Sequence, residues 1–215
     1  MNNTFAVGES GEPNMPPGPA ARILDPVAHP LPPILSPGPG STDVMIGMLP
    51  AWRGVPAAVA AALSSAKAAS EATIKAAEAA TLAAAGSPGL PAAKAAEEAT
   101  KAAAAAQMGS MITSSAGGAD IHTCATPLPI PPHGPGVVID GSPTVMINNL
   151  QACRQGDTIL EAVGPPNKIA MGMLNVHIGD QGAGNSGAAE GAFQDAAASG
   201  TPLVCKGECE ACGNM

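Results

Sequence analysis

The sequence has very few aromatic residues from which to build a core. Its 215 residues include one Trp, two Phe and no Tyr, together 1% of the chain, beside 26 Gly and 23 Pro. Much of the hydrophobic fraction is Ala, which buries little area per residue, so we expect side-chain packing to provide only a small core. Metal ligation and docking onto a partner commonly compensate for such a core.

Positive charge and long apolar runs are scarce as well. Nine Lys and Arg residues stand against 17 Asp and Glu residues, giving a net charge of −8. No basic patch for nucleic-acid phosphates or anionic lipid is therefore expected. Residues 1–18 lack the basic segment and apolar stretch of a signal peptide. Charged residues recur every few positions in 56–108, so we expect no transmembrane helix there.

A short phrase that occurs three times predicts β-strands. In each copy a Gly is followed four residues later by Val and six residues later by Ile. Apolar side chains therefore alternate, as on a strand with one buried face. The copies read GSTDVMIG from Gly40, GSPTVMIN from Gly141 and GMLNVHIG from Gly172. The pattern indicates a repeat protein built from small β units.

A second pattern lies upstream of each strand phrase and indicates a metal site. In three places an Asp is followed four residues later by a residue that is able to bind a metal, and His122 adds another candidate. The three pairs are Asp25 and His29, Asp120 and Cys124, and Asp157 and Glu161. If three units surround a pseudo-threefold axis, the second members of these pairs converge near it.

The composition divides the chain into five segments. We predict a flexible leader, a first β unit, an Ala-rich helical insertion, two further β units, and a Gly/Ala-rich tail that contains Cys205, Cys209 and Cys212. Their ranges are 1–18, 19–54, 55–110, 118–180 and 181–215. The three tail cysteines lack the fourth ligand of a closed zinc site, so an inert or weakly metal-binding tail, a redox role and a second shared metal all remain open.

The insertion is predicted to form a helical hairpin. Pro56 and Pro91 suit first helical positions, Gly86 and Gly109 suit helix ends, and two helices of about 30 and 18 residues follow. Each helix groups its charged residues in one sector and has an almost pure Ala face opposite. Segment 56–108 is therefore either a docking arm for an effector or chaperone, or a low-complexity spacer.

Several motifs together carry a resemblance to a known family. The chain reads PAAR from Pro19, QACR from Gln151, DPVAH from Asp25, DIHTC from Asp120 and HGPG from His133. In this order the motifs resemble those of the PAAR-repeat proteins, over most of the predicted β part. The resemblance implies a mainly β fold, in which three pseudo-threefold β-hairpin repeats form a small cone pinned by zinc. The Ala-rich helical hairpin would be inserted into that cone.

The same resemblance implies a function and a partner. Proteins of this family cap and sharpen the trimeric spike of type VI secretion systems and related contractile injection machines. We therefore expect one chain to bind one trimeric spike protein, help it puncture the target envelope with transient membrane contact, and carry effectors. Such a protein is cytoplasmic before firing and is then injected with the spike.

One structural Zn²⁺ ion is the expected cofactor. Structural zinc sites fill four tetrahedral positions, and the favoured ligands, which also match the resemblance, are His29, His122, Cys124 and His133. Glu161 stands where the family frequently has Cys and is the alternative ligand, although a solvated or hydrogen-bonded role is favoured for it. His177 is expected to be a face residue of its strand.

Two other functional classes are weighed against the spike tip. A zinc hydrolase or toxin is disfavoured because the sequence has no H-E-x-x-H, no G-x-S-x-G and no P-loop, so we expect no enzyme. An adaptor is the closer alternative, in which the helical hairpin or the tail recruits a separate effector.

Overall fold

The structure is a computed structural model that describes residues 17–28, 34–124 and 133–179. The leader up to residue 16, His29, and the tail from residue 180 with its three cysteines lie outside the described residues. Residues Pro17–Gly179 belong to one compact unit.

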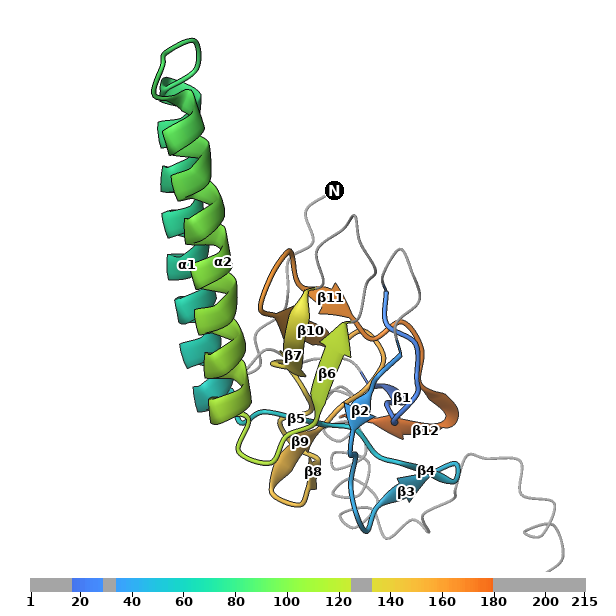
Figure 1. Ribbon diagram of the computed structural model, residues 1–215. Helices are drawn as coiled ribbons and strands as arrows, with labels where there is room; N and C mark the ends of the chain where they lie inside the picture. Colours follow the sequence, from blue (N-terminus) through green and yellow to red (C-terminus); the bar gives the residue numbers. More distant parts are fainter. Residues whose placement is uncertain (1–16, 29–33, 125–132, 180–215) are drawn as a thin grey trace, which may run out of the picture. The chain divides into compact units, whose positions relative to one another are not determined.

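Twelve short strands and two long helices make up the described residues (Figure 1). In chain order they are β1 (Gly18–Ala20), β2 (Pro37–Gly38), β3 (Met45–Ile46), β4 (Leu49–Pro50), β5 (Arg53–Gly54), α1 (Ala57–Ala83), α2 (Leu90–Ser115), β6 (Ile121–Cys124), β7 (Gly134–Val138), β8 (Met146–Ile147), β9 (Leu150–Ala152), β10 (Thr158–Glu161), β11 (Asn167–Lys168) and β12 (Met173–Ile178).

All the strand pairs are antiparallel, as the prediction of β-hairpin units requires. The largest sheet has the order β11-β10-β7-β6-β2, and three small sheets contain β1-β12, β3-β4 and β5-β9-β8. The helices are 27 and 26 residues long, whereas no strand exceeds six residues. The described fold is therefore mixed and not mainly β, because the two helices together contain more residues than all the short strands.

The prediction of a strand in each of the three repeated phrases is confirmed. The phrases contain β3, β8 and β12, and their isoleucines, Ile46, Ile147 and Ile178, are all buried. The three side chains share one hydrophobic cluster with Ala20, Ala51 and Ala152. Equivalent positions of three sequence repeats therefore build one small core.

Three Arg–Asp pairs recur in this part of the fold. In each pair the backbone N–H of the Arg donates to one carboxylate oxygen of the Asp, at 2.7 to 2.9 Å, and the guanidinium Nε donates to the same carboxylate. The Arg follows an Ala by two residues each time. The pairs are Arg22–Asp25, Arg53–Asp120 and Arg154–Asp157.

The residues that precede these three arginines bond to one another in a closed ring. Trp52 N–H donates to the Ala21 carbonyl at 2.9 Å, Cys153 N–H to the Trp52 carbonyl at 3.0 Å, and Ala21 N–H to the Cys153 carbonyl at 2.8 Å. All three residues have no exposed surface and pack in a second cluster. Three segments that are distant in the sequence are thus joined through mutual backbone hydrogen bonds.

The predicted helical hairpin forms, but its second helix is longer than predicted. Helix α1 ends before Gly86, which has a φ of 77°, and residues 84–89 form the turn. The expected end at Gly109 is wrong, because α2 continues to Ser115. Met108 and Ile112 of this last part are buried against the β strands, and this tertiary packing outweighs the low helix propensity of glycine.

The end of the hairpin where the chain enters and leaves packs against the β strands. Leu63, Met108 and Ile112 share a third cluster with Val137 of β7 and Leu160 of β10. The buried residues of the two helices all lie in this part. Figure 1 shows α1 and α2 side by side along their length, so beyond the shared cluster each helix packs mainly against the other.

Candidate metal centre

Three residues of the metal-binding types converge at one end of the largest sheet. They are Cys124 at the end of β6, His133 just before β7 and Glu161 at the end of β10. One ligand atom from each lies within 4.8 Å of the others. Cys124 and Glu161 are buried and His133 is partly buried. Among the described residues this is the group that has the composition and geometry of a metal site.

The register of the strands explains why these side chains meet. Strand β7 lies between β6 and β10, and its Gly136 pairs with His122 on one side and with Glu161 on the other. Directly paired residues project from the same face of a sheet, and so does the residue two positions further along, which here is Cys124. His122, Cys124 and Glu161 therefore share one face.

Gly136 provides the space in which this cluster forms. A Cβ atom at this position would lie 2.8 Å from Glu161 Cγ and 3.1 Å from the Leu160 carbonyl oxygen. Real Cβ atoms almost never approach another atom to 2.8 Å, and 3.1 Å is tighter than most of their contacts, so a side chain here would displace the Glu161 side chain or the paired strand. Because Gly136 has no side chain, the Glu161 carboxylate can lie next to both His122 and His133.

Polar contacts hold the Glu161 carboxylate. His133 Nδ1 lies 2.8 Å from Glu161 Oε2, and the Asn167 side-chain amide donates to the same oxygen. His122 Nε2 lies 3.5 Å from Glu161 Oε1. The Glu161 side chain has no exposed surface. A buried carboxylate in contact with two imidazoles is stable only with such partners or with a cation.

The donor types and their spacing fit a zinc ion. Cysteine sulfur, histidine nitrogen and carboxylate oxygen are the common protein ligands of Zn²⁺, with tetrahedral bonds of about 2.0 to 2.3 Å. Such bonds place ligand atoms about 3.3 to 3.8 Å apart. Separations within 4.8 Å reach this range through small side-chain rotations. When bound, the ion would supply a structural crosslink between the ends of β6, β7 and β10.

Glu161 has two possible roles in such a site. It contributes one of the three converging ligand atoms. It also contacts His133 Nδ1, and a ligating histidine usually donates its other ring N–H to a carboxylate, which fixes the ring orientation. In the second role His133 would bind the ion through Nε2, and Glu161 would orient it.

The outcome for the predicted ligands differs from residue to residue. Cys124 and His133 belong to the converging group, and His122 adjoins it through Glu161. His29 lies outside the described residues, so its predicted role stays a prediction. The favoured interpretation of Glu161 as a hydrogen-bonded residue agrees with its contacts, but its position also makes it a candidate ligand.

Two residues of metal-binding type, His177 and Cys153, do not belong to the metal centre, and Asn167 was not predicted to contact it. His177 is exposed on β12 opposite Pro19, as expected for a strand-face residue. Burial raises the pKa of the Cys153 thiol well above its usual value, which disfavours the thiolate form needed for metal binding. Asn167 was missed because its contact with Glu161 depends on the pairing of β10 with β11.

Comparison of the chain with the models of known protein families and with curated proteins gives no match. The resemblance to the PAAR-repeat proteins therefore rests on the sequence motifs alone. Neither described helix has the length and hydrophobicity that crossing a bilayer requires.

Proposed function

We propose that this chain is the tip of a contractile injection machine of the type VI secretion kind, and that it caps and sharpens a trimeric spike. The observation that carries this proposal is the closed ring of hydrogen bonds among Ala21, Trp52 and Cys153. A trimer offers three identical surfaces at its end, and a single chain can match them only with three similar units. The ring and the three Arg–Asp pairs provide such units.

In this proposal the spike contacts exposed apolar side chains on the repeated strands. Met45 of β3, Met146 of β8 and Leu174 of β12 are 55%, 50% and 65% exposed. They come from the three repeated phrases whose isoleucines meet in one cluster. Exposed apolar patches mark interaction surfaces. We assign these three exposed side chains to contacts with the trimeric spike.

In this proposal a single zinc ion crosslinks the narrow end of a three-unit cone, and the chain is a structural component rather than an enzyme. Cys124, His133 and Glu161 or His122 are the described residues that would hold the ion, with His29 as the predicted further ligand. A rigid end suits a part that is driven through an envelope by the contraction of other proteins. Effectors would attach through the helical hairpin or the tail, and membrane contact would be transient.

The test is co-expression with the trimeric spike protein of a contractile injection machine from the same organism. Native mass spectrometry should detect one chain per trimer. Replacing Met45 and Met146 together by Lys should abolish the complex, because two charges would be buried in an apolar interface. The matched control is Leu82→Lys, since Leu82 is 77% exposed near the far end of the hairpin.

The outcomes separate the tip from the adaptor. A complex that forms equally well with the double variant would contradict docking through the repeated strands. An effector that co-purifies with the chain and is lost with Leu82→Lys, while the trimer stays bound, would add the adaptor role to the tip.

A further inference from the structure

The helical hairpin contributes a buried cation to the surroundings of the metal centre. Lys67 lies on α1, is only 8% exposed and donates from Nζ to the Ala162 carbonyl at 3.1 Å. Ala162 directly follows Glu161 in the chain. Buried lysines are rare unless they are paired, and burial lowers the pKa of Lys67 while Glu71 and Glu161 act in the opposite sense.

Segment 162–164 contacts His133 and directly follows Glu161 in the chain. Ala162 N–H donates to the Pro135 carbonyl at 3.1 Å, and Val163 N–H donates to the His133 carbonyl at 3.0 Å. A Cβ atom at Gly164 would lie 3.2 Å from His133 Nε2, so the segment runs close to the imidazole ring. Any shift of this segment therefore moves two candidate metal ligands.

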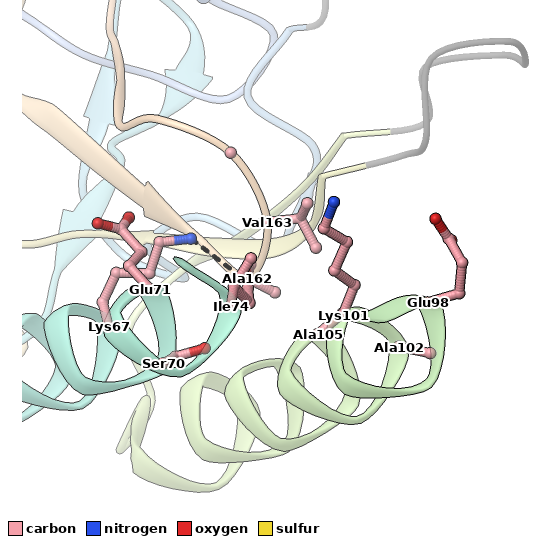
Figure 2. A pocket seen from close by; sticks show the side chains of 11 residues that line it. Lys67, Ser70, Glu71, Ile74, Glu98, Lys101, Ala102, Ala105, Ala162 and Val163 are labelled. Carbon is pink, nitrogen blue, oxygen red and sulfur yellow. Dashed lines mark hydrogen bonds between the residues drawn. The ribbon is translucent and has the colours of Figure 1, made fainter. Parts of the chain in front are cut away.

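Packing beside this segment is incomplete. Lys67 lines a cavity of about 500 Å³. Figure 2 shows its side chain reaching from α1 to Ala162. Val163 and Gly164 line the cavity, together with Glu71 and Lys101 from the two helices. The Lys67 hydrogen bond is a specific polar contact between this segment and α1.

We infer that Lys67 is a positioning residue for the metal centre, and that the helical hairpin clamps segment 162–164 through it. This inference rests on the metal centre of the proposed function. It also assigns the base of the insertion a role that a simple docking arm or spacer does not have. Gly109 of α2 faces the same segment, since a Cβ atom built on it would lie 3.8 Å from Ala162 Cβ and 3.5 Å from Pro135 Cγ.

The experiment compares the full chain with three variants. Lys67→Met keeps the length and burial of the side chain but removes the donor, Lys67→Arg restores a donor, and Lys75→Met removes an exposed charge from the same helix. The first readout is amide hydrogen exchange at Ala162 and Val163 in the presence of a chelator, with the Cys153 amide as an internal reference. The second is the zinc dissociation constant, measured by chelator competition.

Exchange at Ala162 and Val163 should accelerate about tenfold or more in Lys67→Met, with no change at Cys153. Lys67→Arg should restore most of the protection. Zinc should bind about tenfold more weakly to Lys67→Met, as is usual when an outer contact of a metal site is lost. Equal exchange in Lys67→Met and Lys75→Met, or a uniform rise that includes Cys153, would overturn the clamp.

The exchange readout needs neither zinc nor a spike, so it separates the two proposals. Faster exchange confined to Lys67→Met, with no zinc bound by any variant, would support the clamp and count against the metal centre. Failure to bind a trimeric spike would leave both readouts unaffected.

Discussion

Replacing Arg53 by Met should destabilise the fold far more than the equivalent replacement of Arg22. Arg53 donates to both Asp120 oxygens, at 3.0 and 2.9 Å from the side chain and 2.8 Å from the backbone. Asp120 has no exposed surface. Removing the arginine leaves a buried carboxylate without its counter-charge, which typically costs about 3 to 5 kcal/mol.

The Arg22–Asp25 pair supplies the matched comparison. It has the same three types of contact, but its two side chains are 17% and 6% exposed, against 9% and 0% in the Arg53–Asp120 pair. Water can therefore replace part of the lost contacts, and we expect Arg22→Met to cost about 1 to 3 kcal/mol, the range of a few charged hydrogen bonds.

Urea unfolding followed by tryptophan fluorescence measures both values. The chain contains a single tryptophan, Trp52, which is fully buried next to Arg53. Adding Asp120→Asn to Arg53→Met should recover part of the loss, because the amide oxygen still accepts from the Gly40 N–H while the unpaired charge disappears. A cost for Arg53→Met at or below that of Arg22→Met, or no recovery in the double variant, would refute the reasoning.

Three further predictions concern other parts of the structure. Gly136→Ala places a methyl group against Glu161 Cγ and should lower the zinc content and reduce the stability by about 1 to 3 kcal/mol. Gly109→Ala has room for the methyl group and should be neutral or stabilising. Calorimetry measures the stability of both variants, and elemental analysis measures their zinc content. Cys153 should resist iodoacetamide in the folded protein and react only after denaturation, as mapped by mass spectrometry, because its thiol is buried and its pKa raised. Burial also raises the pKa of Asp157 from 3.8 to about 7. The folded state then binds more protons between these values, so the free energy of unfolding should fall as pH rises from about 4 to 7, and Asp157→Asn should flatten that decline in urea titrations.

The three strand phrases were predictable because alternation is a local signal. Ile46, Ile147 and Ile178 occupy the same position of each phrase, and burial of one strand face requires that spacing. The Arg53–Asp120 pair was not predictable from the sequence. In the other two units the Arg and the Asp are three residues apart, whereas Arg53 and Asp120 are separated by the whole helical hairpin. Only the fold brings them together.

The candidate site was partly predictable for a similar reason. The spacing of four residues between Asp120 and Cys124, and between Asp157 and Glu161, is visible in the sequence and places both members of each pair on the same side of an extended chain. The contact of Glu161 with His133 depends on β7 pairing with β10 and on a glycine at the crossing point, Gly136. Sequence spacing carries no information about which strands become neighbours.

The Arg–Asp pairs and the metal centre stabilise opposite ends of the same strands. Asp120 and Asp157 immediately precede β6 and β10, and Cys124 and Glu161 end those strands. At about 3.3 Å per residue the two ends are about 13 Å apart. The Arg–Asp pairs and the backbone ring therefore hold the residues at the start of β6 and β10. The strands then position the candidate ligands at their other ends. A bound zinc ion would hold only the far ends of β6 and β10, about 13 Å from the residues that begin these strands.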